Sequence, residues 1–235
     1  MINIDAFFKV SYGMYLVSSR FQEEKVGYIA NTVFQVTSQP PKFGISCNKG
    51  NYTSEIIKKS GAFAFSVLGE KASTGLIGDF GFRSSNEIDK FNGINYFFGE
   101  TGSPIVTDSC LAWFDCRLSD TFDVGSHLIF IGEVIDANLI DSGQKVLSYD
   151  HYREVMKGFS PKNAPTFIDK SLVARETSNK SLQNELWQCQ LCHFTYESEK
   201  GDPISGIDPG TKFNDLPEDW CCPICGADKT LFELD

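Results

Sequence analysis

The sequence Cys189-Gln190-Leu191-Cys192, followed 29 residues later by Cys222-Pro223-Ile224-Cys225, decides the fold of the C-terminal part of this chain. Each pair of cysteines forms a C-x-x-C turn, and two such turns can place four thiolates at the corners of a tetrahedron. A tetrahedral site made only of sulfur suits either zinc or iron. The gap between the turns exceeds the roughly 15–20 residues of the common zinc pattern. We therefore expect a metal site with the ligands Cys189, Cys192, Cys222 and Cys225.

The residues around the four cysteines form an aromatic and Gly-Pro framework. It consists of Trp187, Phe194, Tyr196, Gly201-Asp202-Pro203, Gly206-Ile207, Pro209-Gly210-Thr211, Phe213, Leu216-Pro217, Asp219-Trp220, Pro223 and Gly226. With this framework, residues 186–235 resemble the rubredoxin family of small iron proteins that carry single electrons. The resemblance implies iron, whereas the alternative is a zinc ribbon without a redox role. Rubredoxins usually have glycine after the second cysteine of each turn. Gly226 fits this pattern, whereas the first turn has His193 at the corresponding position. His193 is either a turn residue with positive φ or an extra metal ligand.

The net charge of −10 is unevenly distributed along the chain. Residues 186–235 contain three Lys and ten Asp or Glu, a net of −7, which leaves −3 for the preceding residues. Phosphate backbones are bound by clustered Lys and Arg, so we expect no nucleic-acid partner. The acidic C-terminal segment is either a docking face for a basic redox partner or simply a solvated surface.

The cysteine usage and the N-terminus both favour a cytoplasmic protein. Cys47, Cys110, Cys116 and Cys221 show no regular disulfide spacing, and a thiolate metal site implies a reducing compartment. The first residues lack a basic region followed by an apolar stretch, so no signal peptide is expected. Uninterrupted apolar runs do not exceed the five residues of Cys110–Phe114, so no membrane span is expected.

Short runs rich in aromatic and β-branched residues dominate the first 160 residues and predict strands. The runs are Tyr12–Ser18, Tyr28–Val36, Phe43–Cys47, Ala62–Leu68, Cys110–Leu118 and His127–Ala137. Two helices are expected, one over Ser54–Ser60 with Thr53 as its N-cap and Gly61 as its end, and one over about Ser73–Asp79. Many strands and few helices favour a barrel over a doubly wound sheet. Gly75, Gly78 and Gly81 lie three residues apart, which we interpret as a mobile loop.

A polar stretch beside the second predicted strand indicates a binding site. Asn31 and Thr32 are neighbours on a strand, and Ser46-Cys47-Asn48-Lys49 leads into the first predicted helix. The N-terminus of a helix offers free N–H groups and a positive dipole end, which favour phosphate. Lys49 adds a positive charge, and Ser46, Asn48 and Thr53 add hydrogen-bond donors. The alternative is a polar turn with ordinary capping by Thr53.

In this order, the motifs of residues 1–165 resemble the flavin reductase-like family, which has the FMN-binding split-barrel fold. The likeness is carried by Gly13, Asn31–Pro41, Ser46–Thr53, Phe82-Arg83-Ser84, Asp89-Lys90-Phe91, Gly125-Ser126-His127 and Gly132-Glu133-Val134. Family members usually have Asp where this chain has Ser126. The resemblance implies a homodimer with FMN near the subunit interface.

The resemblance also implies roles for individual residues. Asn31 and Thr32 would contact the isoalloxazine ring, and Arg83 would contact the flavin or the nicotinamide nucleotide. His127 would either lie over the flavin and help position nicotinamide, or be a hydrogen-bonded histidine on a strand. The phosphate region would be held by residues of one loop and the following helix start, namely Ser46, Cys47, Asn48, Lys49, Asn51 and Thr53.

We therefore expect a mainly β chain with a split barrel at 1–165, a linker at 166–185 and a rubredoxin-like metal domain at 186–235. Fusions of a flavin reductase with rubredoxin in anaerobes resemble the whole architecture. They imply electron transfer from NAD(P)H through FMN to iron, and on to an acceptor such as a flavo-diiron protein that reduces oxygen or nitric oxide. Two alternatives stay open: a flavoredoxin-like carrier without NAD(P)H activity, and a flavoprotein with a zinc docking module. In the absence of a Rossmann motif, the residues do not distinguish NADH from NADPH.

Overall fold

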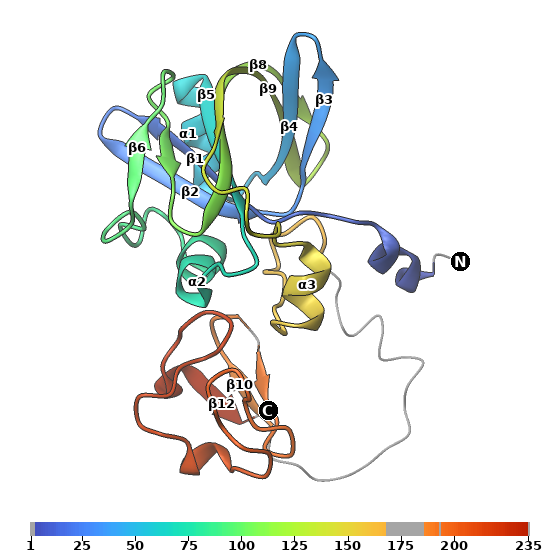
Figure 1. The fold of residues 1–235 in the computed structure, drawn as a ribbon, viewed down its shortest axis with the longest axis vertical. Coiled ribbons are helices and arrows are strands. Elements are labelled where there is room, and N and C mark those ends of the chain that lie inside the picture. The colour runs from blue at the N-terminus through green and yellow to red at the C-terminus, as the bar shows by residue number, and fades with distance from the viewer. Residues whose placement is uncertain (1–2, 168–185, 193, 235) are drawn as a thin grey trace.

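A computed structural model of the chain describes residues 3–167, 186–192 and 194–234. Figure 1 shows a β-barrel domain above and a small C-terminal domain below, next to helices α2 and α3. The strands are β1 (Tyr15–Phe21), β2 (Glu24–Ala30), β3 (Val33–Ser38), β4 (Pro41–Asn48), β5 (Ala62–Leu68), β6 (Tyr96–Phe98), β7 (Pro104–Val106), β8 (Cys110–Asp123), β9 (His127–Leu139), β10 (Trp187–Cys189), β11 (Thr195–Tyr196) and β12 (Phe232–Leu234). The α-helices are α1 (Tyr52–Ser60), α2 (Thr74–Phe82) and α3 (Tyr149–Glu154), and short 3₁₀ helices cover Ile4–Lys9, Phe213–Asp215 and Lys229–Leu231.

The large sheet is antiparallel throughout, with the strand order β2-β1-β5-β8-β9-β4-β3. Its two outer strands, β2 and β3, are consecutive in the chain and are joined only by Asn31 and Thr32. The sheet must therefore curl until its two edges meet. Hydrogen bonds hold the junction, because Ser46 N donates to Thr32 O (3.1 Å) and Tyr28 Oη donates to Ser46 O (3.0 Å). The prediction of a mainly β barrel is confirmed, and its closure lies at the predicted polar stretch.

Helix α1 closes one end of the barrel core. Ile56 and Ile57 are completely buried, and the barrel interior is filled by side chains such as Phe63, Phe65 and Phe130. The helix ends at Gly61, whose φ of 69° is left-handed, as the sequence predicted. The predicted cap was wrong, because the N-cap is Asn51, whose side chain accepts from Thr53 N. Asn51 is as good a cap as threonine, so the helix begins at Tyr52 instead of Ser54.

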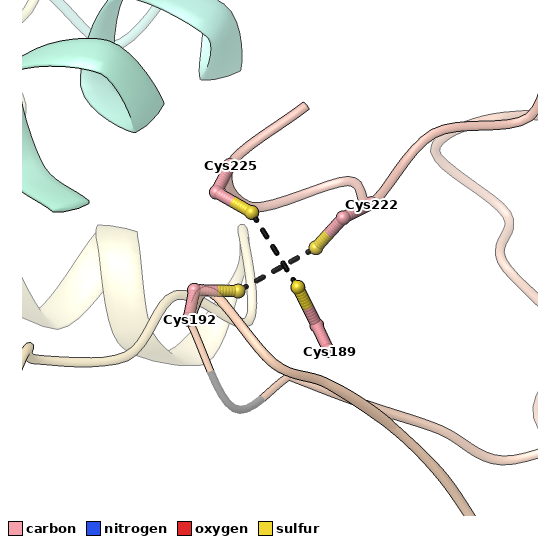
Figure 2. Close-up of side chains that lie close together, drawn as sticks. All are labelled: Cys189, Cys192, Cys222 and Cys225. Atoms are coloured by element: carbon pink, nitrogen blue, oxygen red, sulfur yellow. Dashed lines mark hydrogen bonds between the residues drawn. The ribbon is translucent and has the colours of Figure 1, made fainter. Parts of the chain in front are cut away.

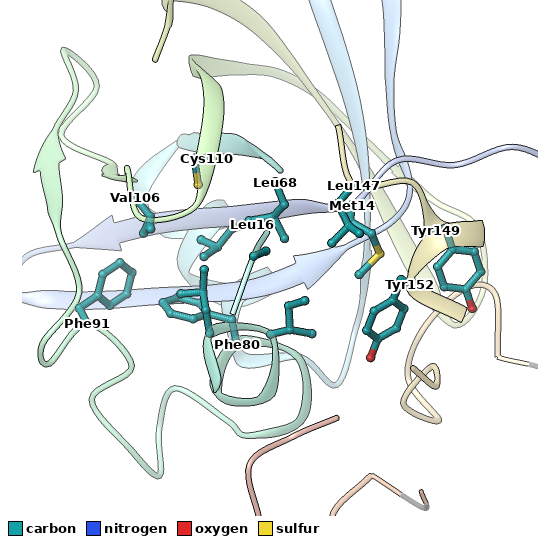
Figure 3. Close-up of a cluster of buried hydrophobic side chains, with 13 residues drawn as sticks. Met14, Leu16, Leu68, Phe80, Phe91, Val106, Cys110, Leu147, Tyr149 and Tyr152 are labelled. Atoms are coloured by element: carbon teal, nitrogen blue, oxygen red, sulfur yellow. The ribbon is translucent and has the colours of Figure 1, made fainter. Parts of the chain in front are cut away.

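Helices α2 and α3 cover a second core under the barrel, shown in Figure 3. Helix α2 buries Leu76, Ile77 and Phe80, and Ser73 caps it by accepting from Leu76 N. The interpretation of Gly75, Gly78 and Gly81 as a mobile loop is wrong, because all three lie within α2. Glycine lowers intrinsic helix propensity, but burial of the apolar face offsets that loss. Helix α3 was not predicted, although Tyr149 and Tyr152 lie on one face and are buried in this core.

Strand boundaries differ from prediction mainly at tight turns. Strand β5 lies at the predicted residues, whereas the predicted run Tyr28–Val36 is divided into β2 and β3. The predicted run Tyr12–Ser18 extends instead to Phe21, because β1 and β2 form a hairpin that pairs Phe21 with Glu24. The exposed charged residues at the start of β2 concealed this strand in the sequence. Among the described residues, no helix is long and apolar enough to cross a membrane.

Lys90 is an unusual core residue, because it is only 5% exposed. Its Nζ donates to Gly27 O (2.9 Å) and Phe80 O (3.4 Å), and so ties the loop after α2 to β2. Burial lowers the pKa of Lys90 from 10.5 to about 8. The folded protein therefore favours the neutral amine more than the unfolded chain does.

We expect this amine to make stability depend on pH. Between pH 8 and 10.5 the unfolded chain binds more protons at Lys90, so the free energy of unfolding rises with pH. Over this pH window, Lys90 should raise the free energy of unfolding by about 2 kcal/mol, and replacing Lys90 with methionine should remove that rise. Urea unfolding of both proteins, followed by circular dichroism at several pH values, measures the difference. If the free energies of unfolding of the two proteins differ by the same amount from pH 7.5 to 10, the lowered pKa of Lys90 is contradicted.

The C-terminal domain contains the three-stranded sheet β11-β10-β12 and its own core. The Trp187 and Phe213 rings stack at 4.4 Å between centroids, and Trp220 and Phe232 pack beside them. Trp220 Nε1 donates to Oδ2 of the buried Asp202 (2.9 Å), which satisfies both groups. This core is small and lies against the cysteines.

Candidate functional site

The four predicted cysteine ligands come together in the C-terminal domain. All four are buried, and their sulfur atoms lie within 4.8 Å of one another. The Cys189 and Cys225 sulfurs are 3.7 Å apart, and those of Cys192 and Cys222 are 3.5 Å apart. Figure 2 shows the four sulfurs pointing to a common centre. A metal about 2.3 Å from each sulfur of a regular tetrahedron places the sulfurs about 3.8 Å apart, so the cage fits one such ion.

The backbone of each turn is fixed by hydrogen bonds next to the ligands. Cys189 N donates to Phe194 O (2.8 Å), and Cys222 N donates to Ala227 O (2.7 Å). Gly226 has a left-handed φ of 70°, which explains the glycine after the second pair. His193, which takes the corresponding place after the first pair, lies outside the described residues. The extra-ligand alternative for His193 therefore falls outside the described structure.

A cation at the centre of the cage would stabilise the four cysteine sulfurs in their thiolate form. Hydrogen bonding with Cys192, Cys222 and Cys225 lowers the pKa of Cys189, whereas contact with Cys189 raises the pKa of Cys192. Four thiolates at this separation would repel one another. Without a metal, some of the four sulfurs therefore stay protonated. A bound metal ion replaces those protons and allows all four sulfurs to be thiolates.

A cleft of about 300 Å³ opens at the barrel closure, between the barrel and helices α2 and α3. Its walls come from the ends of β2 and β4, the loop before α1, helices α2 and α3, and the segment after α3. Polar side chains on one part of the wall face aromatic side chains on another. The wall includes Tyr28, Asn31, Ser46, Asn48, Asn51, Phe80, Phe82, Arg83, Tyr149, Tyr152, Phe159 and Asn163.

The predicted flavin residues fall into two groups. The residues that line this cleft are Asn31, Ser46, Asn48, Asn51 and Arg83. The others lie just behind it or to the side: Thr32, Cys47, Lys49 and Thr53. Arg83 Nε lies 3.6 Å from Asp79 Oδ1 one turn earlier on α2.

Each residue behind the cleft has its own environment. Thr32 Oγ1 donates to Asn31 Oδ1 (3.0 Å) and so orients that amide. Cys47 is in the barrel core, where burial raises the pKa of its thiol to about 12. Lys49 Nζ pairs with Asp123 Oδ2 at 2.6 Å on the surface. Thr53 Oγ1 is a buried side-chain oxygen that has no hydrogen-bond partner among the described residues.

The loop before α1 uses its backbone N–H groups internally. Those of Lys49, Gly50 and Asn51 donate to Ser126 O, Asn48 Oδ1 and Asn48 O. The N–H groups of Thr53 and Ser54 donate to Asn51. The loop therefore offers an anionic ligand mainly side chains instead of free N–H groups.

The composition of the cleft suits a flavin. A flavin has a flat, largely apolar ring system at one end and a polar, charged tail at the other. Aromatic side chains such as Phe82 can pack against the ring, while Asn48, Asn51 and Arg83 provide donors for the tail. The amide of Asn31 is held in place, because its Nδ2 donates to Thr166 Oγ1 (2.6 Å).

His127 is held by hydrogen bonds at the start of β9. Its Nδ1 lies 2.8 Å from Ser126 Oγ, and its Nε2 lies 3.1 Å from the carbonyl oxygen of Asn163. Asn163 lines the cleft, whereas His127 does not. This arrangement has the features of the hydrogen-bonded alternative, with His127 positioning the segment that covers the cleft.

The segment after α3 was the part of the cleft that sequence reasoning missed. Residues 159–165 and the two tyrosines of α3 contribute much of its wall. The carbonyl of Phe159 accepts from Tyr152 Oη (3.2 Å), which anchors the segment to α3. The i, i+3 spacing of Tyr149 and Tyr152 was the signal available in the sequence.

The cleft and the cage share wall residues. Phe82 and Phe159 line the cleft and also pack against the buried core around the cysteines. Tyr152 lines the cleft as well. Burial is the main cause that raises the pKa of Tyr152, and the neighbouring Cys192, Tyr149 and Cys225 act in the same direction. Two sites that are far apart in the sequence are therefore neighbours in the fold.

Both halves of the chain match known protein families. The model of the flavin reductase like domain matches residues 7–156, and the rubredoxin model matches residues 186–232. Among solved structures, the flavin reductase HpaC in complex with NADP+ has a TM-score of 0.54 and 29% identity. That match covers 62% of this chain and 89% of the other. The split-barrel fold and the rubredoxin-like cysteine cluster are thereby confirmed.

Two relatives extend the comparison. High molecular weight rubredoxin of Moorella thermoacetica is 45% identical over 224 residues, covering 95% of this chain and 96% of its own. A ferric-chelate reductase (NAD(P)H) of Archaeoglobus fulgidus is 41% identical over 168 residues, covering 72% of this chain and 99% of its own. The first relative spans both halves of the chain.

Proposed function

Because the chain belongs to the flavin reductase-like family and carries a C-terminal rubredoxin domain, we propose that it is an NAD(P)H-dependent flavin/rubredoxin oxidoreductase. Electrons would pass from NAD(P)H through FMN to iron held by the four cysteines, and then to an external redox protein. The single observation that carries the proposal is the position of the cleft next to the cage, with Phe82 and Phe159 touching both.

The roles of the cleft residues follow from their positions. FMN, when bound, can accept a hydride as two electrons and release the electrons one at a time. Asn31, oriented by Thr32 and Thr166, would hold the edge of the ring, and Asn48, Asn51 and Arg83 would hold the phosphate. Ser46 supplies a further donor near that end, whereas Thr53 is buried behind the wall of the cleft.

Iron held by the four cysteines would carry one electron at a time, so each hydride would support two successive deliveries to the acceptor. The balance is one NAD(P)H oxidised, two one-electron reductions of the acceptor and one proton released to water. Hydrogen bonds to the sulfurs and burial by aromatic side chains set the potential of the iron. No side chain has to act as an acid or base in the hydride transfer.

Assembly, compartment and acceptor are part of the same proposal. Exposed apolar side chains on β3 and β8, such as Phe34, Val36 and Phe122, provide surface that a second copy can bury in a homodimer. The four cysteines must stay reduced to bind a metal, so we propose that the protein works in a reducing compartment, the cytoplasm. The acidic C-terminal domain suits a basic docking patch on an acceptor, for which a flavo-diiron oxygen or nitric oxide reductase is the candidate.

The test is an anaerobic stopped-flow experiment on protein loaded with FMN and iron, mixed separately with NADH and NADPH. We expect the flavin absorbance to bleach first and the iron–thiolate colour to disappear afterwards. An unchanged spectrum with both nucleotides, together with full reduction by dithionite, would overturn the reductase proposal in favour of an electron carrier. If the purified protein shows no iron–thiolate absorbance and contains zinc, the assignment of iron to the four cysteines is overturned.

A further inference from the structure

Gly78 of α2 lies directly against the backbone of a cage residue. A Cβ atom at position 78 would lie 2.4 Å from the carbonyl oxygen of Cys225 and 2.8 Å from its Cα. Separations under 3.0 Å are not tolerated, and backbone atoms cannot move aside as a flexible side chain can. The contact therefore requires glycine at this position as long as the C-terminal domain is seated on α2.

The neighbouring glycines of α2 do not have this requirement. A Cβ at position 75 would meet nothing within 4 Å, and one at position 81 would make an ordinary contact of 3.7 Å with Ile29. All three glycines have helical backbones, so an alanine or leucine at any of them changes helix propensity in the same direction. Gly78 alone among them reports the seating of the C-terminal domain.

We propose that the C-terminal domain docks on α2 and α3 of its own chain, with Gly78 as the positioning residue, and that electrons cross inside one chain through this contact. The electron transfer in this proposal rests on the proposed function, whereas the docking of the domain is independent of it. The contact joins the Cys225 side of the cage to the helix whose last residue, Phe82, lines the cleft.

Aromatic side chains lie between the two sites around this contact. Phe159 lies between the cleft and the C-terminal core, with its ring centroid 6.4 Å from that of Phe194. Tyr152 packs behind it and is only 3% exposed. A tethered domain seated in this way receives electrons at a high effective concentration of donor.

The docking test compares matched substitutions in α2 of the full-length, iron-loaded protein. Gly78→Leu and Gly78→Ala introduce the clash, and Gly75→Leu and Gly75→Ala are the controls in open space. Hydrogen exchange of the peptides that cover residues 74–83 and 149–160 is the readout, and it needs no nucleotide. Iron and flavin contents show that each variant has folded, and the alanine variant serves if the leucine variant does not fold.

We expect exchange in both peptides to be at least about tenfold faster in the Gly78 variants than in the matched Gly75 variants. Equal exchange in the two sets, with iron and flavin retained, would overturn the docking. In the stopped-flow experiment, loss of the iron colour should slow at least about tenfold in Gly78→Leu and less than about twofold in Gly75→Leu. If docking holds but neither nucleotide bleaches the flavin, the proposed function fails and the docking stands.

Transfer inside one chain is tested by mixing two variants that each lack one site. Cys222→Ser keeps the cleft and removes a cage ligand, whereas Asn51→Asp keeps the cage and impairs the cleft. After subunit exchange, the mixture should reduce iron no faster than the Asn51→Asp protein alone. Iron reduction in the mixture that approaches half the wild-type amplitude at the wild-type rate would show that electrons cross between subunits and would overturn this part of the proposal.

Discussion

Replacing Cys222 with serine is expected to abolish iron binding and to unfold the C-terminal domain. The domain has about 50 residues, and a core of that size is rarely stable without a metal or a disulfide. Binding energy of the metal is folding energy in such domains, so the loss of one of four thiolates removes both. We expect iron to fall from about one per chain to less than about 0.1 per chain. Metal analysis and limited proteolysis of residues 186–235 measure the two effects.

The neighbouring Cys221 provides the matched control. Its side chain is exposed and lies outside the cage, so Cys221→Ser changes the same atoms one position earlier. That variant should keep iron, colour and resistance to protease. Both variants should bind FMN with an affinity within about threefold of wild type, because the cleft residues that hold the polar tail belong to the barrel. Equal iron contents in the two variants would show that the cage is not the metal site.

Replacing Asn51 with aspartate is expected to weaken FMN binding by about 100-fold, or about 2.7 kcal/mol. Asn51 lines the cleft and caps α1 by accepting from Thr53 N. Aspartate is an equally good cap, so α1 keeps its start. The new carboxylate, however, faces the place proposed for the phosphate and repels it at short range. Titration of the flavin-free protein, followed by flavin fluorescence, gives the affinity.

Two comparisons separate charge repulsion from damage to the helix. Asn51→Ser also keeps a capping oxygen but adds no charge, and it should weaken FMN binding less than about tenfold. Riboflavin, which lacks the phosphate, should bind wild type and Asn51→Asp with similar affinity. The thermal midpoint of flavin-free Asn51→Asp should stay within about 3 °C of wild type. A loss of riboflavin binding as large as the loss of FMN binding would place the phosphate elsewhere.

The metal ligands were predictable because each pair is local. In a C-x-x-C turn, two ligands three residues apart are brought together by a single turn of backbone, whatever the rest of the fold does. The aromatic and glycine framework then specifies the surroundings, and positions such as Gly226 have a conformational reason that can be recognised from sequence. The alternation of β-prone runs and turns likewise predicted a barrel before any contact was known.

The cleft was only partly predictable because it is built from separate segments. Asn31, Ser46 and Arg83 meet only because the sheet closes between β2 and β3. The same closure leaves Cys47 and Thr53 behind the wall, although their neighbours in the sequence line it. Patterns along the chain indicate which residues are near the site, but the direction of each side chain depends on strand register and on the helix start.

By itself, the sequence determined the four-cysteine cage, the mainly β barrel and the order of the two domains, because these depend on local spacing and on periodicity. Only the tertiary structure decided that α2 continues past the predicted Ser73–Asp79 to Phe82, and that Gly78 meets Cys225. The sequence predicted a helix at this place but also suggested a mobile loop from the three glycines, and burial of Leu76, Ile77 and Phe80 explains why the helix prevails. The proximity of cleft and cage is likewise a property of packing, because Phe82 and Phe159 contact both sites although they are 77 positions apart in the sequence.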